Sequence, residues 1–181
     1  MCIRDRILNI DNGGMLALAA STASFEGTGP ATLRIGLFGS ATMSLDNGAS
    51  ADVDGSVHVG GTISPSTTAS LTLSNGSSME MNTLLASGTA QATTVAQIDV
   101  LSNSTLTVHG AMTLGDSIGD YDLTVHGGTL DLGILTSRVR ETGTLELING
   151  ALIVDDDLVI DGGAFTRDAA SVVFYVGGSS G

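Results

Sequence analysis

The sequence predicts an all-β protein, a right-handed parallel β-helix (β-solenoid) of about six coils with three short strands in each coil. Gly, Ser and Thr fill 25, 20 and 21 of the 181 positions and Lys is absent, a composition that disfavours helical bundles. Short segments alternate apolar and polar residues, which is the period of a strand with one buried face. These segments recur at intervals close to one coil of a solenoid, so repeats dominate the chain.

The predicted first strand of each repeat follows one template: apolar, polar, apolar, polar, Asn, Gly. It begins at Leu8, Met43 and Leu71 and continues, less completely, at Ile98, Leu123 and Leu145. The first interval is therefore 35 residues and the later ones are 28, 27, 25 and 22. Because coils stack about 4.8 Å apart, we expect Met43, Leu71, Ile98, Leu123 and Leu145 to form one ladder through the core. A seventh copy is expected near Val172.

A second strand is predicted five or six residues beyond the first, and several copies add a third. The second strands are Leu16/Leu18, Ala51/Val53, Met79/Met81, Leu106/Val108, Leu130/Leu132 and Leu152/Val154. The third strands are Leu33/Ile35, Val57/Val59, Met112/Leu114 and Leu158/Ile160. Residues 20–30 are expected to be a loop, and Arg138 and Arg140 are placed in another short loop. Asn-Gly suits the corners because both residues tolerate positive φ.

The rival fold is an antiparallel sandwich or meander, since Asn-Gly between alternating segments is also a strong hairpin signal. A hairpin would pair Leu71 with Met79 across Asn75-Gly76, whereas the solenoid places Leu71 between Met43 and Ile98. Hairpins give no reason for three-strand units to recur at one coil length, so the solenoid is preferred.

The two ends of the chain differ from the repeats. Residues 1–6, Met-Cys-Ile-Arg-Asp-Arg, resemble a translated sequencing-adaptor end and are interpreted as a cloning scar. Residues 7–181 are interpreted as one β-solenoid domain that is truncated at both ends. Cys2 is the only Cys, so the solenoid itself would contain none.

Two segments, Thr105–Gly115 and Asp122–Gly133, resemble the Thr-Leu-Thr-Val and Gly-Gly units of bacterial autotransporter passengers and similar surface-anchored β-helix repeat proteins. The likeness covers roughly residues 7–181. It implies export to the extracellular cell surface, in association with an outer membrane. It also implies a structural or adhesive role as a stalk or passenger, with a surface ligand such as a carbohydrate or a host or matrix protein.

The net charge of the chain limits the classes of partner that it can bind. Nineteen acidic residues against six Arg give a net charge of −13, so we expect no nucleic-acid binding, because phosphates would be repelled. No apolar run approaches the roughly 20 residues of a membrane helix, so no membrane insertion is expected within this chain.

Candidate chemistry is sparse, and we predict no catalytic residues, no bound cofactor and no enzymatic activity. His58, His109 and His126 fall in a third, a second and a first strand, so they are not expected to share one metal site. Asp155, Asp156 and Asp157, with Asp161 beyond them, are open to three interpretations: a solvated turn, a weak Ca²⁺ site formed by Asp155, Asp157 and Asp161, or a catalytic cluster. The alternative to a structural role is a fragment of an extracellular carbohydrate-active β-helix enzyme, of the polysaccharide lyase or glycosidase type.

Overall fold

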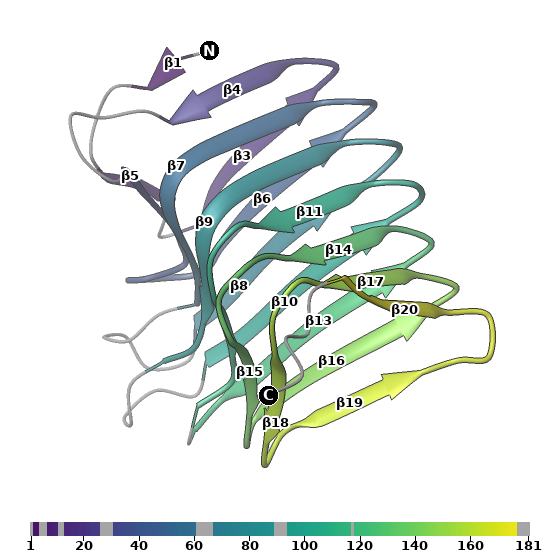
Figure 1. Ribbon diagram of the computed structural model, residues 1–181. Coiled ribbons are helices and arrows are strands. Elements are labelled where there is room, and N and C mark those ends of the chain that lie inside the picture. Colours follow the sequence, from purple (N-terminus) through teal and green to yellow (C-terminus); the bar gives the residue numbers. More distant parts are fainter. Residues whose placement is uncertain are drawn as a thin grey trace.

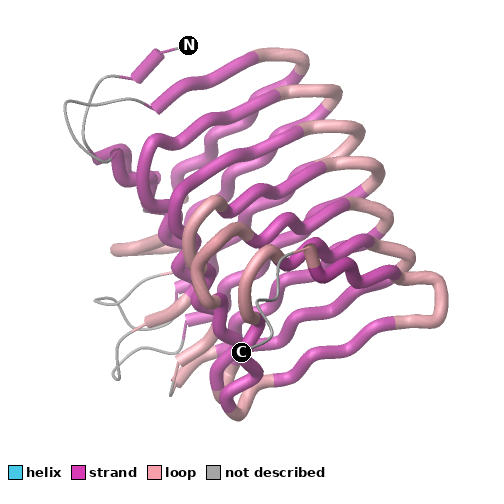
Figure 2. Tube along the Cα trace, in the orientation of Figure 1, coloured by secondary structure: helices cyan, strands magenta, loops and turns pink. Residues whose placement is uncertain are grey.

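The computed structural model describes residues 2–3, 7–10, 13–25, 31–60, 67–88, 94–116 and 118–176. These residues form strands and turns without a helix, wound into a parallel β-solenoid of about six turns (Figures 1 and 2). The predicted fold class is confirmed. The strands stack in three rows, one in a seven-stranded sheet and two in a 13-stranded sheet that bends around the core.

Each row collects the strands at one position of successive coils. The first row is β3 (Gly14–Ala19), β6 (Ala41–Asp46), β8 (Thr67–Leu73), β10 (Thr94–Leu101), β13 (Asp120–His126), β16 (Gly143–Ile148) and β19 (Ala164–Arg167). The second is β1 (Cys2–Ile3), β4 (Thr22–Phe25), the first parts of β7 (Ser50–Val59) and β9 (Ser78–Ala86), β11 (Thr105–Val108), β14 (Thr129–Leu132), β17 (Ala151–Val154) and β20 (Val172–Tyr175). The third is β2 (Ile7–Ile10), β5 (Ala31–Ile35), the last parts of β7 and β9, β12 (Met112–Leu114), β15 (Ser137–Arg140) and β18 (Leu158–Asp161).

The predicted ladder runs through the first row as expected. Leu71 is in register with Met43 on one side and Ile98 on the other, and all three side chains are fully buried. Leu123 and Leu145 continue the ladder. Every strand pair that the described residues form is parallel, so the antiparallel alternative is wrong.

The first and last copies were placed in the wrong rows. Leu8 belongs to β2 and pairs with Leu33 in the third row. Leu16, predicted in a second strand, pairs with Met43 in the first row. The ladder positions 16, 43, 71, 98, 123, 145 and 165 therefore follow at intervals of 27, 28, 27, 25, 22 and 20 residues. The seventh copy begins in β19 rather than near Val172, which lies in a second-row strand.

Three further strands were missed. The expected loop 20–30 contains β4, whose Ala23 and Phe25 are buried. Arg138 and Arg140 lie on β15 and not in a loop, with Val139 fully buried between them. The last part of β9 supplies a third-row strand that pairs with β7 and β12.

The corners between the first and second rows are stacked left-handed turns. Asn75 and Gly76 have φ of 53° and 75°, and Asn47 and Gly48 have 54° and 73°. The Ala49 N–H donates to the Asp46 carbonyl at 3.1 Å and closes the turn within its own coil, and the Gly48 N–H donates to the Asn75 carbonyl at 3.1 Å and bonds it to the next coil. Asn-Gly here bends a coil instead of closing a hairpin, because the two flanking strands pair with strands of neighbouring coils and not with each other.

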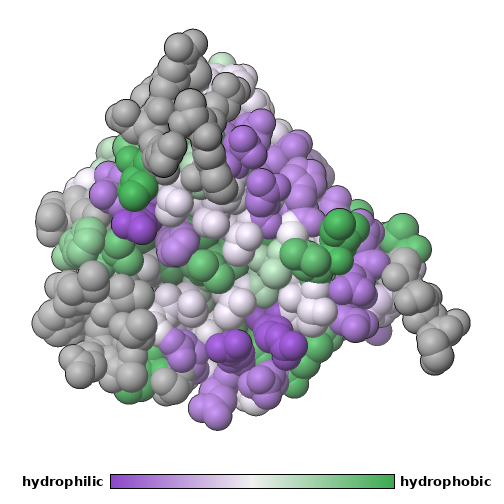
Figure 3. Space-filling model, turned by 60° about the vertical axis from the view of Figure 1, so that its left-hand side comes forward, coloured by the Kyte–Doolittle hydropathy of each residue, from purple (hydrophilic) through white to green (hydrophobic). Residues whose placement is uncertain are grey.

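Most inward positions are apolar and most outward positions are polar, many of them Ser or Thr. The columns of buried side chains run without interruption from β6 to β16, while Ser and Thr hydroxyls link neighbouring coils outside. Ser50 donates to Thr22 and Ser70 to Thr42, each at 3.1 Å. On the face drawn in Figure 3, polar and apolar residues lie side by side rather than in one apolar area.

Candidate functional site

The clearest cluster of titratable side chains is a carboxylate strip on the second row, defined by Glu80, His109, Asp131 and Asp155. Glu80 on β9 is in register with Thr107, which in turn is in register with Asp131 on β14. His109 follows β11, so its ring reaches back across one coil, and its Nε2 lies 3.4 Å from a Glu80 carboxylate oxygen. Both side chains are more than half exposed (56% and 55%), so this ion pair contributes little to stability.

Burial is the main reason that the pKa of Asp131 is raised, and the negative charge of Asp155 adds to it. His109 opposes the shift. A general acid–base pair needs two titratable groups within reach of one bond. The strip instead spreads one His and three carboxylates along an outer surface, where they can bind protons or attract cations.

A second candidate lies at the corner between the third and first rows. Asp116, Arg140, Glu141 and Asp161 line an open hollow of about 380 Å³. Arg140 and Asp161 are in register on adjacent strands, and the rim is fixed by Thr142, whose hydroxyl donates to the Asp116 carbonyl at 2.9 Å. One guanidinium among three carboxylates gives the hollow a net negative charge.

The predicted Asp run lies in the turn between β17 and β18. The Asp155 N–H donates to the Leu132 carbonyl, and the Thr136 hydroxyl donates to a carboxylate oxygen of Asp156 at 3.3 Å. Asp161 lies at the far end of β18, where it lines the hollow. The three proposed calcium ligands Asp155, Asp157 and Asp161 are thus divided between the two ends of one strand.

No group of three or more His, Cys, Asp or Glu side chains that could hold a metal ion occurs among the described residues. Ca²⁺ takes six to eight oxygen ligands at about 2.3–2.6 Å, so a preformed set would have to converge. Weak Ca²⁺ binding stays a prediction. Calorimetric titration of the chain beside an Asp155→Asn, Asp157→Asn variant tests it, with heat of binding lost in the variant as the expected result.

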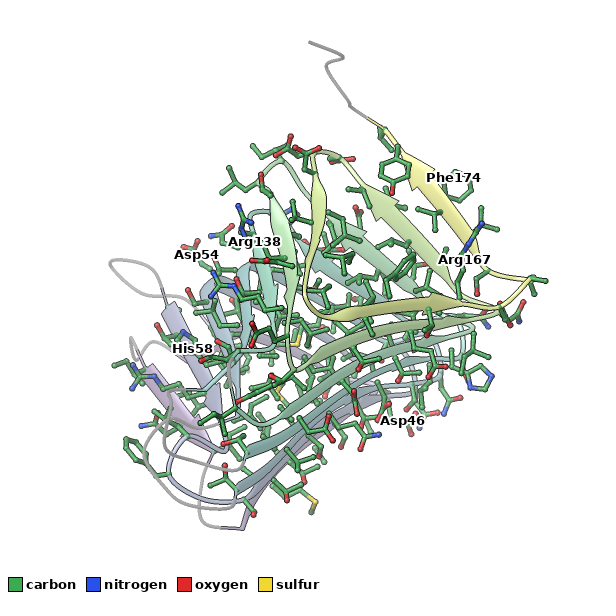
Figure 4. The ribbon with its side chains drawn as sticks, turned by 90° about the horizontal axis from the view of Figure 1, so that it is seen from below. Asp46, Asp54, His58, Arg138, Arg167 and Phe174 are labelled. Carbon is green, nitrogen blue, oxygen red and sulfur yellow. The ribbon has the colours of Figure 1, made fainter. Side chains whose placement is uncertain are left out.

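The three His lie in the three rows to which the sequence assigned them. His58 is half-buried on β7, and its pKa is lowered mainly by that burial and further by the positive charge of Arg34. His126 ends β13 and is exposed. Asp54, His58 and Arg138 lie along one side of the solenoid, away from Asp46 (Figure 4).

Asp46 is held by the neighbouring corner. Its carboxylate accepts hydrogen bonds from the Asn75 amide at 2.7 Å and the Ser74 hydroxyl at 2.8 Å. These bonds lower the pKa of Asp46. These hydrogen bonds join two coils, so Asp46 has a structural role.

Sequence reasoning missed the contact between Glu80 and His109. A signal for it existed, because aligning Met79 and Met81 with Leu106 and Val108 puts Glu80 beside Thr107 and diagonal to His109. Residues this far apart in sequence become neighbours only when the coil register is applied to outward as well as inward positions.

Comparison with protein families, curated proteins and solved structures finds no match to this chain. The described part of the chain contains no helix long and apolar enough to cross a membrane.

Proposed function

We propose that this chain is a non-enzymatic structural or adhesive segment, a stalk or passenger, of a secreted or cell-surface bacterial protein. The observation that carries the proposal is the unbroken parallel stacking of about six coils. At about 4.8 Å for each coil, the stack forms a rod roughly 30 Å long. A rod whose coils all have the same construction suits the presentation of a surface at a distance from an anchor.

Two features of the rod support this role. Neighbouring coils are joined by backbone hydrogen bonds along three rows and at the corners, so load applied along the axis is shared among many bonds. The net charge of −13 keeps crowded rods apart and soluble. In the adhesive form of the proposal, the ligand is a carbohydrate or a host or matrix protein.

The load-bearing role is tested by pulling the chain by its two ends in a single-molecule force experiment. We expect stepwise lengthening, one coil at a time. Intervals of 20 to 28 residues correspond to steps of roughly 70–100 Å at about 3.5 Å per residue. A Leu123→Asn variant, with one core ladder broken, is expected to release its central coils at lower force. Complete extension in one step at negligible force would contradict the stalk role.

The non-enzymatic part is tested on a panel of plant, algal and bacterial polysaccharides, by measuring reducing ends and unsaturated products. The expected result is no release above a heat-denatured control. Product formation that disappears in a Glu80→Gln or Asp131→Asn variant would replace this proposal with the carbohydrate-active enzyme. Beads coated with the chain, tested for adhesion to glycan and matrix-protein surfaces, separate the adhesive form from the purely structural one.

A further inference from the structure

An arginine and a histidine lie directly opposite each other on the outer side of the third row. Arg34 on β5 is in register with His58 on β7, and both are half-buried between fully buried apolar neighbours, so their side chains point outward. Figure 4 shows His58 on the outer side of the solenoid. Neighbouring strands are about 4.8 Å apart, and like charges directly opposite each other are destabilising. A protonated His58 beside Arg34 would therefore be stabilised by an anion.

The guanidinium of Arg34 is incompletely paired. Its Nε is buried from solvent without a hydrogen-bond partner, and the side chain forms no ion pair with any described residue. A buried donor that lacks a partner costs free energy, and the cost is larger for a charged group. Because Arg34 as a whole is only half-buried, an oxyanion can approach it from solvent. Turning the side chain toward that oxyanion would pair Nε and a terminal nitrogen with two oxygens at once.

Polar side chains around this pair supply further hydrogen-bond donors. Asn9 on β2 is exposed and in register with Arg34, on the side away from His58. Thr32 and Ser56 lie two residues earlier on β5 and β7, opposite each other and half-buried. Hydroxyl and amide groups donate hydrogen bonds to oxyanions. The outer side of three adjacent strands thus carries two groups that can be cationic and three neutral donors.

The carboxylates on the strands packed against His58 lie elsewhere. Asp52 on β7 and Glu80 on β9 are in register with each other in the second row. Asp54 is four residues before His58, about 13 Å away along an extended strand. Among the described residues, the charge that shifts the pKa of His58 is Arg34, which lowers it further than burial does. The two groups are therefore not neutralised by a neighbouring carboxylate in the described part of the chain.

We propose that Arg34 and His58 form an oxyanion-binding site that takes the carboxylate or sulfate group of an acidic sugar. The assignment to a sugar rests on the adhesive form of the proposed function, whereas the oxyanion site does not. A bound anion stabilises the protonated imidazole, so the anion binds more tightly as pH falls. The net charge of −13 repels anions in general, so saturable binding of an anion reports this local pair.

NMR titration of the histidine ring signals tests the site. The probes are sodium sulfate and sodium acetate, compared with sodium chloride at equal ionic strength. We expect the His58 signals to shift saturably and its pKa to rise in sulfate and acetate, while His109 and His126 titrate as in chloride. Sulfate should bind roughly fivefold or more tightly at about pH 5 than at about pH 8. Identical titration of His58 in all three salts would overturn the proposal.

Variants of one column locate the site. Arg34→Gln is expected to abolish sulfate binding and, in chloride, to raise the pKa of His58, because the neighbouring positive charge is gone. Arg34→Lys keeps that charge without the fork and should bind more weakly. Arg138→Gln is the matched control, since it removes the same charge from the same outward column four coils away, and it should leave binding unchanged. Unchanged binding in folded Arg34→Gln, or an equal loss in Arg138→Gln, would overturn the site.

Disaccharides of equal size identify the ligand: one with a uronic-acid carboxylate, one with a sulfate ester and one neutral. The two acidic sugars should shift the His58 signals as sulfate does, and the neutral sugar should not. Sulfate binding without binding of either acidic sugar, or equal binding of the neutral one, would overturn the assignment to an acidic sugar. Loss of bead adhesion with intact binding of sulfate would contradict the adhesive function and leave the oxyanion site in place.

Discussion

Replacing Leu123 by Asn, beside the same replacement at Thr124, tests the register of the solenoid. Leu123 is fully buried between Ile98 and Leu145, while its neighbour Thr124 faces outward and is half-buried. Both variants introduce the same uncharged side chain one residue apart. Any difference in stability therefore reports which face each position occupies.

The magnitudes follow from burial. Removing the Leu side chain loses about 1.5–3 kcal/mol of apolar burial. An amide left in the core without partners costs about 1–3 kcal/mol more. Leu123→Asn should thus lower the free energy of unfolding by roughly 2.5–6 kcal/mol. An outward substitution such as Thr124→Asn should change it by no more than about 0.5 kcal/mol.

Asn is preferable to Asp for this comparison because of the neighbours of Thr124. Asp99 and Glu146 lie directly opposite it on the two adjacent strands. A carboxylate at Thr124 would face a like charge on each side, which is itself destabilising. The uncharged pair removes that complication.

The assay is equilibrium urea unfolding followed by circular dichroism, with midpoints and slopes compared among the three proteins. A solenoid can unfold in parts, so equal slopes are required before the midpoints are converted to free energies. Equal losses in the two variants, or a larger loss for Thr124→Asn, would refute the inward and outward assignment of β13.

Three further predictions concern close approach and titration. Gly133→Ala should destabilise the chain, because a Cβ there would overlap the backbone of His109. In Gly48→Ala the new Cβ meets open space, so the only cost is the positive φ of that residue. Urea midpoints of the two variants are compared, and that of Gly133→Ala should be lower. The pKa of Asp122 is raised mainly by burial and further by repulsion from nearby acids, so its ionised form destabilises the fold once the pH rises through the folded pKa. Asp122→Asn should therefore stabilise the chain at pH 7, and this gain should vanish below about pH 4. Urea midpoints at the two pH values measure the difference. The effect of Asp46 on stability has the opposite pH dependence, because its pKa is lowered in the folded chain. Its carboxylate stabilises the fold above the ordinary Asp pKa of about 3.9, and this contribution is lost as the pH falls through the folded pKa. Asp46→Ala should therefore lower the urea midpoint at pH 7 and leave it unchanged in strong acid.

The central coils could be predicted from the sequence because their inward positions are plainly apolar. Met43, Leu71, Ile98 and Leu123 alternate with polar residues and recur at nearly constant intervals, and burial enforces the register. The Asn-Gly corners could be predicted from backbone conformation, since few other residue pairs tolerate two successive left-handed conformations.

The first coil was misread because a strand of any row has the same alternating pattern. Leu8-Asn9-Ile10 copies the template of Met43-Ser44-Leu45, yet it belongs to the third row. The 35-residue interval after Leu8 indicated the error, because moving the start of the repeat to Leu16 gives an interval of 27 residues, close to the others. Local pattern identifies a strand, and only the interval between strands identifies its row.

Strand β15 was missed because it has a single inward apolar residue. Val139 is buried between two Arg, and the other inward position is Ser137, which is buried although polar. Its hydroxyl accepts a hydrogen bond from the Met112 N–H at 3.0 Å. When the hydrogen-bond partner of a buried polar residue lies in another coil, the alternation of apolar and polar residues in its own segment does not reveal that it is buried.

The stacked corner at Asn75-Gly76 also bears on the chemical ageing of the protein. Asn-Gly pairs deamidate spontaneously when the Gly backbone nitrogen attacks the Asn side-chain carbonyl. Here the Gly76 N–H is bonded to the Ser102 carbonyl at 3.1 Å, and the Asn75 amide is held by Asp46 at 2.7 Å, so neither reacting group is free to turn toward the other. We expect deamidation at Asn75 to be slow in the folded chain and fast in urea, as mass spectrometry of aged samples would show. The extent of deamidation at Asn75 would then measure how often this corner opens.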